Sequence, residues 1–109
     1  MSIQLLAAEK VSGVDTITTI YTAPSGGPDT IINALSVTNN SEASATYKAY
    51  IYDSVGVTAG AVSPQKIVVK DRFDSSPAIV NQAIKAGGTL RVENSTADAL
   101  VFHLTGVEQ

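Results

Sequence analysis

The sequence predicts an all-β domain: an antiparallel β-sandwich, jelly-roll-like, of about eight short strands. Short segments alternate apolar with polar residues, which is the period of a strand with one buried face. Val, Ile and Thr are abundant, and branched side chains fit a pleated sheet. Turn-forming residues divide the chain about every dozen residues, and no strong helical pattern occurs. Because strand order cannot be read from these patterns, an immunoglobulin-like sandwich is the alternative.

The first part of the chain predicts three strands. Residues 3–8 are a short apolar strand, and residues 1–14 as a whole could form an extended N-terminal arm. Residues 16–22 are almost entirely β-branched or aromatic, which favours a strand. A loop with two Pro and two Gly at 23–29 precedes the third strand, at residues 30–38.

Regular alternation assigns the side chains of two central strands to faces. In the strand at 30–38, Ile31, Leu35 and Val37 would share one face. In a strand at 45–53, residues 47, 49 and 51 would share one face, opposite Lys48, Tyr50 and Tyr52. The strand at 30–38 is apolar or small on both faces, which is typical of the middle of a sheet.

The later segments are less regular. Residues 54–63 form a loop without any charged residue, and residues 66–70 form a short strand with a charge at each end. Residues 71–77 predict a turn that carries one aromatic side chain. Residues 78–85 fit either a strand or a short helix, because their apolar spacing also matches a helical period.

The chain ends in two strongly alternating segments, which predict a hairpin. Leu90 and Val92 alternate with polar residues in the first arm, and Leu100, Phe102 and Leu104 alternate in the second. The polar residues 94–98 between them are suited to reverse the chain. This pairing would place His103 beside Arg91 or Glu93.

Composition restricts the possible functions. The length of 109 residues indicates one domain, residues 1–109. The absence of cysteine excludes disulfides, thiolate catalysis and Cys-ligated zinc, and small domains without cross-links often oligomerise. A net charge of −3 with scattered basic residues gives no reason to bind nucleic acid. No apolar run is long enough to span a membrane, and the N-terminus lacks signal-peptide features, so we expect synthesis in a cytoplasm.

No enzyme chemistry is indicated, and we expect no catalytic, cofactor-binding or metal-binding residue. His103 is the single histidine, and no nucleophile-elbow motif accompanies it. Asp71 and Asp74 lack the regular spacing of a calcium loop and are expected to be turn residues. The Asn-x-Ser/Thr patterns that begin at Asn39 and Asn94 are expected to be turns as well.

Two features instead indicate contact surfaces. Tyr is favoured at interfaces because it joins a large apolar ring to a polar tip, and Tyr50 and Tyr52 share one strand face. The chargeless stretch at 54–63 would favour association if it were exposed. The candidate subunit or capsid contacts are these two tyrosines and four further apolar residues: Tyr50, Tyr52, Val55, Val57, Val62 and Phe73.

Several segments resemble the small all-β structural proteins of tailed bacteriophages. The resemblance is carried by Ile20-Tyr21-Thr22-Ala23-Pro24-Ser25-Gly26, by a strand that ends in Thr38-Asn39-Asn40, and by the closing Gly106-Val107-Glu108. These elements are turn chemistry, and they cover about the middle third and the last quarter of the chain. Residues 55–62 and 72–74 depart most from the pattern and are expected to be specific to this protein's own partner.

The resemblance implies a non-enzymatic virion protein that is made in the host cytoplasm and released by lysis. Among such proteins we favour a capsid decoration (cement) protein, expected to be a homotrimer bound to the major capsid protein outside the head. The alternative is a neck or tail component, or a baseplate or fibre domain that binds host carbohydrate. A small hydrolase or a metal-binding β-domain is a third, less favoured reading.

Overall fold

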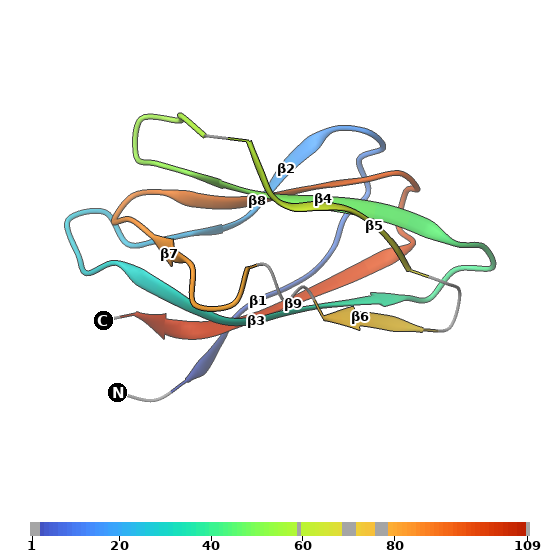
Figure 1. Cartoon of the computed structure of the whole chain (residues 1–109), viewed down its shortest axis with the longest axis horizontal. Coiled ribbons are helices and arrows are strands. Elements are labelled where there is room, and N and C mark those ends of the chain that lie inside the picture. Colours follow the sequence, from blue (N-terminus) through green and yellow to red (C-terminus); the bar gives the residue numbers. More distant parts are fainter. Residues whose placement is uncertain (1–2, 59, 69–71, 76–78, 109) are drawn as a thin grey trace.

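The computed structural model arranges nine strands in two antiparallel sheets that pack face to face (Figure 1). It describes residues 3–58, 60–68, 72–75 and 79–108, with residues 61–67 and 73 described by their backbone alone. The all-β sandwich expected from the sequence is confirmed. Within the described residues, no helix is long and apolar enough to cross a membrane.

One layer is a five-stranded sheet and the other a four-stranded sheet. The five-stranded sheet has the order β1 (Gln4–Lys10), β9 (Leu100–Glu108), β3 (Thr30–Asn39), β6 (Phe73–Ser75), and β7 (Ala83–Ile84) also pairs with β3. The four-stranded sheet has the order β2 (Ile17–Thr22), β8 (Thr89–Asn94), β4 (Ala45–Tyr52), β5 (Ala61–Val68). β4 and β5 are the one pair of consecutive described strands that also pair with each other.

The two strands at the end of the chain form as predicted, but they do not form a hairpin. Leu90 and Val92 of β8 and Phe102 of β9 are buried, as expected. However, β8 belongs to the four-stranded sheet and β9 to the five-stranded sheet, so the connection between them crosses from one layer to the other. Apolar faces that oppose each other across a sandwich are as well buried as those of neighbouring strands, so alternation alone cannot distinguish the two arrangements.

The immunoglobulin-like alternative is wrong for this chain. In an immunoglobulin sandwich the first two strands share a sheet. Here β1 and β2 lie in different sheets, and β1 pairs with the last strand, β9. Within the stretch considered as an N-terminal arm, Gln4–Lys10 is therefore an edge strand of the five-stranded sheet.

The predicted faces of β3 are partly wrong, because a β-bulge changes which side chains point inward. The register with β9 shifts between Ile32 and Ala34, so the inward face changes from even-numbered to odd-numbered residues. Ile32 is buried before the shift, and Leu35 and Val37 are buried after it. Ile31 is only half-buried and does not share the core face of Leu35 and Val37.

The segments after β4 also differ from the prediction. β5 begins at Ala61, inside the stretch predicted as a loop, and β6 occupies the predicted turn at 71–77 by pairing with β3. Within 78–85 the described residues form a turn from Ile79 to Gln82, followed by the two-residue β7. Pairing to a long central strand stabilises these short strands, and their own sequences give little sign of it.

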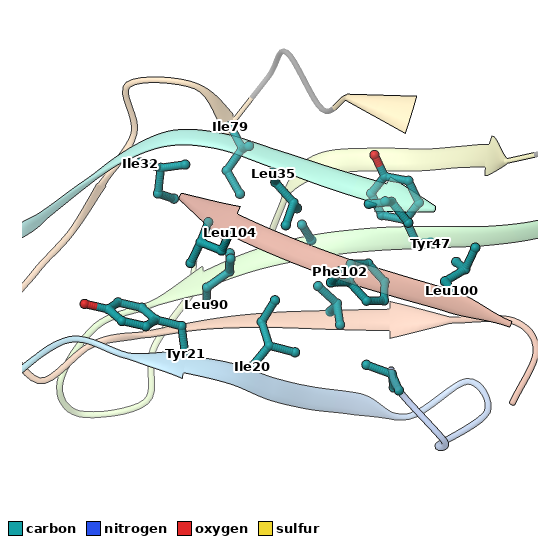
Figure 2. Close-up of a cluster of buried hydrophobic side chains, with 14 of the residues drawn as sticks. Ile20, Tyr21, Ile32, Leu35, Tyr47, Ile79, Leu90, Leu100, Phe102 and Leu104 are labelled. Atoms are coloured by element: carbon teal, nitrogen blue, oxygen red, sulfur yellow. The ribbon is translucent and has the colours of Figure 1, made fainter. Parts of the chain in front are cut away.

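The core between the sheets is built from both layers (Figure 2). Tyr47 of β4 and Phe102 of β9 meet edge to face across it, with their ring centroids 5.8 Å apart. The hydroxyl of Tyr47 donates to Asp74 Oδ2 on β6 at 2.7 Å, so this side chain joins the two sheets. Asp74 is thus a structural partner of Tyr47.

A second tyrosine joins the sheets where the two ends of the chain meet. The hydroxyl of Tyr21 on β2 donates to Glu108 Oε2 at 2.6 Å and lies 2.9 Å from Thr30 Oγ1. Gln4 Nε2 donates to the other oxygen of Glu108 at 3.2 Å, which brings β1 into the same network. Burial, and secondly the hydrogen bond to Glu108, raise the pKa of Tyr21 above its usual value.

This network should make the protein less stable in alkali. An unfolded tyrosine loses its proton near pH 10, whereas folded Tyr21 retains its proton to higher pH, so the stabilisation is complete below about pH 10 and is lost as pH rises through the folded pKa. Urea unfolding of wild type and Tyr21→Phe should show a stability difference at about pH 8 that shrinks toward about pH 11.5. A difference that stays constant over this range would contradict the assignment.

Candidate interaction surface

The outer face of the four-stranded sheet carries the two tyrosines singled out in the sequence. Along β4, Ala45, Tyr47 and Ala49 are buried, while Lys48, Tyr50 and Tyr52 alternate with them and are half-exposed. The core face of β4 is therefore the face of Tyr47. Tyr50 and Tyr52 lie on the outside of the sandwich.

Both tyrosines are held by side chains of the neighbouring strand β8. Tyr50 pairs with Arg91 in the register, and its hydroxyl donates to Glu93 Oε1 at 3.0 Å. The guanidinium of Arg91 lies 4.0 Å from the centre of the Tyr52 ring, within the range of a cation–π contact. The two tyrosine rings are 6.4 Å apart. Tyr50, Tyr52, Arg91 and Glu93 thus form an ordered cluster, here called the aromatic patch.

The electrostatics of the patch follow from these contacts. Partial burial, and secondly the hydrogen bond to the Glu93 carboxylate, raise the pKa of Tyr50 above its usual value. The Tyr50 hydroxyl is therefore a neutral donor at physiological pH. Arg91 adds a positive charge and Glu93 a negative one, so the patch can contact both charged and apolar groups of a partner.

The turn that follows β4 presents two valines on a fixed backbone. Asp53 Oδ1 accepts hydrogen bonds from the backbone N–H groups of Val55 and Val57, at 3.0 and 2.9 Å. The Asp53 N–H in turn donates to the Val57 carbonyl at 2.9 Å, and Gly56 takes the positive φ of 81° that closes the turn. The side chains of Val55 and Val57 are 79% and 61% exposed. Residues 53–57 are here called the hairpin tip.

The patch and the tip are adjacent, because Tyr52 ends β4 and Asp53 begins the tip. Four of the six residues singled out in the sequence, Tyr50, Tyr52, Val55 and Val57, therefore lie in two neighbouring segments, the end of β4 and the hairpin tip. The side chains of Val62 and Phe73 lie outside the described part of the structure. The strand of Val62, β5, pairs with β4, whereas the strand of Phe73, β6, belongs to the other sheet.

Arg91 and Glu93 were missed as members of this surface. The predicted terminal hairpin placed them beside His103, but β8 pairs with β4. Their alternation with Leu90 and Val92 already indicated an outward face. The missing information was the identity of the neighbouring strand.

His103 lies apart from the patch, on the outer face of the five-stranded sheet. It is exposed, and its register partners are Ala8 on β1 and Ser36 on β3, neither of which can orient an imidazole as a carboxylate would. Among the residues that the structure describes, no group of three or more His, Asp or Glu side chains could hold a metal ion. Asp71 is outside the described residues.

The two Asn-x-Ser/Thr patterns begin at the last residues of β3 and β8, and only the residues after each Asn bend the chain as expected. Asn39 and Asn94 are 0% and 1% exposed, and each donates to one backbone carbonyl nearby in the chain and to one from a distant segment, Val68 for Asn39 and Val11 for Asn94. A shallow polar pocket of about 110 Å³ lies beside the patch. It is lined by Asp15, Lys48 and Glu93 with their neighbours and contains no arrangement of nucleophile and base.

Comparison with protein-family models, with curated proteins and with solved structures found no match to this chain.

Proposed function

We propose that the chain is a non-enzymatic structural protein of a tailed-bacteriophage virion, most specifically a capsid decoration protein that binds outside the assembled head. The observation that carries the proposal is the hairpin tip, where Val55 and Val57 are 79% and 61% exposed on a backbone fixed by Asp53. Such a tip, beside an ordered aromatic patch, is suited to protein contact. The resemblance of the turn motifs to phage structural proteins is the reason for proposing a bacteriophage virion.

The proposal includes a jelly-roll topology, which the strand pairing supports. With the two-residue β7 set aside, the described residues form eight strands. These pair first with last, second with seventh, third with sixth and fourth with fifth. A long antiparallel ribbon that rolls up on itself has this nesting. The cross-pairs β9–β3 and β8–β4 then close the two sheets. Jelly rolls are common in viral capsid proteins.

The physical basis of decoration would be binding to the assembled lattice. A protein that binds only the assembled state stabilises it by its binding free energy. Burial of one exposed valine contributes about 1.5–3 kcal/mol at most, so one copy of the tip gives modest affinity. Because the turn is already ordered, little conformational entropy is lost on docking. Linked copies in an oligomer then add avidity.

The remaining parts of the proposal concern partners and location. The partners are the major capsid protein and further copies of this chain, with a trimer as the oligomer that the resemblance implies. Nucleic acid and membranes are not proposed as partners. The location is the virion, reached after synthesis in the host cytoplasm and released by lysis.

Capsid binding should depend on the tip valines. Wild type should bind expanded capsids of its own phage saturably, at many copies per shell, and raise their melting temperature. Val55→Asp combined with Val57→Asp should weaken binding by at least about tenfold per buried valine lost, since about 1.4 kcal/mol corresponds to tenfold. Co-sedimentation with capsids measures this.

The control is Val14→Asp, which alters a 48% exposed valine in the β1–β2 connection at the opposite end of the molecule (Figure 1). It should bind like wild type. Equal loss in both variants would contradict a role for the tip. Wild-type protein that binds capsids at only a handful of copies, or not at all, would contradict the decoration role.

The second candidate function is a neck or tail component, or a baseplate or fibre domain that binds host carbohydrate. The exposed side chains of Tyr50 and Tyr52 on an outer sheet face favour it, because sugar rings stack on aromatic side chains. This alternative would be established by two results together. The wild-type protein binds host glycans but not capsids, and Tyr52→Ala loses the glycan binding.

A further inference from the structure

Arg91 carries a positive charge in the aromatic patch that is not paired with a carboxylate. Among the residues that the structure describes, Arg91 forms no ion pair. Its Nε donates to Thr89 Oγ1 at 3.0 Å, and its guanidinium carbon lies 4.0 Å from the centre of the Tyr52 ring. The side chain is half-buried and held on two sides. Its two terminal nitrogens keep their N–H donors available for a further acceptor.

The guanidinium points away from the carboxylate of its own strand. Arg91 and Glu93 face outward two residues apart on β8, a spacing that long side chains can bridge. In the register, Arg91 lies opposite Tyr50, and Thr89 lies opposite Tyr52. Because the guanidinium contacts Thr89 and Tyr52, the side chain runs along the strand toward the end of β4, where the hairpin tip begins. Glu93 lies in the other direction and accepts from Tyr50.

This arrangement presents a planar cation in the geometry that carboxylates recognise. A guanidinium donates two parallel hydrogen bonds to a carboxylate, and it does so while one of its faces is stacked on an aromatic ring. Since Nε is occupied by Thr89, the edge formed by the two terminal nitrogens is the one left for a partner. The stack on Tyr52 already restricts the side chain, so little conformational entropy is lost on binding.

We propose that Arg91 binds an acidic side chain, Asp or Glu, of the protein on which the hairpin tip docks. The inference rests on the proposed function and names the chemistry of the partner at that surface. Charge complementarity selects the occupant, because Val55 and Val57 need an apolar surface and the neighbouring cation needs an anion beside it. An acidic glycan offers the anion but little apolar surface to bury the valines.

Docking of the tip makes an acceptor for Arg91 necessary. A purely apolar partner surface would remove water from the guanidinium without replacing its hydrogen bonds, which is unfavourable. A carboxylate replaces those hydrogen bonds and also neutralises the charge. The contact therefore contributes to specificity as well as to affinity, since a partner without an acidic group at this place is rejected.

Co-sedimentation of three variants with capsids tests the contact. Arg91→Met removes the charge but keeps an apolar stem, and it should weaken binding about tenfold. Arg91→Lys keeps the charge but loses the two-nitrogen edge, so it should weaken binding by a smaller factor. The matched control is Lys48→Met, which removes one positive charge from the same outer face, where Lys48 is also half-buried. It should bind within about twofold of wild type.

The outcomes separate this inference from the decoration role. Wild type that does not bind capsids would overturn both. If Val55→Asp combined with Val57→Asp loses binding while Arg91→Met keeps it, the decoration role stands and the contact at Arg91 is wrong. Equal losses in Arg91→Met and Lys48→Met would indicate unspecific attraction and would also overturn the contact. So would Arg91-dependent binding to the acidic polysaccharide polygalacturonate by a protein that does not bind capsids.

Carbodiimide cross-linking gives a second measurement, which identifies the partner residue. The reagent activates a carboxylate, the amine introduced by Arg91→Lys attacks the activated carbonyl, and an amide forms while the reagent leaves as a urea. Mass spectrometry of this variant bound to capsids should find residue 91 joined to an Asp or Glu of the capsid protein. Lys48 is the internal control and should form few such links. Links to the capsid from Lys48 alone, or from residue 91 only to Glu93 of the same chain, would contradict the proposal.

Discussion

Phe102→Ala should lower the free energy of unfolding by about 3–5 kcal/mol. The Phe102 ring is 0% exposed, lies at the centre of the core and meets Tyr47 edge to face. Its removal therefore leaves a cavity bordered by both sheets. Domains of this size have a total stability of about 5–15 kcal/mol, so the melting temperature should fall by more than about 10 °C. Calorimetry or urea unfolding measures the loss.

Val101→Ala is the matched control for this variant. Val101 is the preceding residue of β9, and it is half-buried on the outer face of the sheet. Its truncation should cost clearly less than that of Phe102. A Phe102→Ala protein that loses no more stability than Val101→Ala would contradict the placement of this side chain at the centre of the core.

Asn39→Ala should have the second large effect, about 2–4 kcal/mol, because it removes four hydrogen bonds of a buried side chain at once. The Asn39 side chain is 0% exposed, and its Nδ2 donates to the carbonyls of Ala43 and Val68 at 2.9 and 2.8 Å. Its Oδ1 accepts from the N–H and the hydroxyl of Ser41 at 2.8 and 2.7 Å. Alanine would remove these four hydrogen bonds, where the chain crosses from β3 to β4.

Asn33→Ala is the control, since it removes the same side chain from the same strand. Asn33 is exposed, and its amide Nδ2 donates to Thr105 Oγ1 at 3.2 Å. Urea unfolding of the two variants should show a loss at Asn39 several times that at Asn33. Equal losses would mean that the buried network contributes no more than an exposed hydrogen bond.

Local periodicity predicted the parts of the fold that depend on neighbours along one strand. The inward faces of β8 and β9 were correct, because Leu90, Val92, Leu100, Phe102 and Leu104 alternate without interruption. The predicted inward face of β3 was partly wrong, because a bulge at residue 33 changes which side chains point inward. The residue type at this position does not indicate a bulge. The strand β6 was predicted as a turn, and β7 lies in a stretch for which a strand and a short helix both remained open, since both strands are stabilised by β3 more than by their own sequences.

The identity of the neighbouring strand is the information that the sequence did not contain. The composition of the candidate surface depends on which strand neighbours β8. Because β8 pairs with β4, Arg91 contacts Tyr52 and Glu93 contacts Tyr50. A β8–β9 hairpin would instead have placed Arg91 and Glu93 beside His103. The tyrosines themselves were predictable from composition and alternation. The rigidity of the hairpin tip was not, because it depends on two hydrogen bonds from the tip backbone to Asp53.

The nested strand pairing also governs how the molecule reaches its folded state. Among the described strands, only β4 and β5 can pair by closing a short loop. β1 and β9, by contrast, are separated by almost the full length of the chain. The pairs β3–β6, β2–β8 and β1–β9 close successively longer loops. The chain loses conformational entropy when each loop closes, before the contacts within the sheet can stabilise it. Proteins dominated by such non-local pairings fold in milliseconds to seconds, which is slow for small domains. The turn that presents Val55 and Val57 is thus also the place where folding can begin locally, and β1 is the last strand for which a partner becomes available.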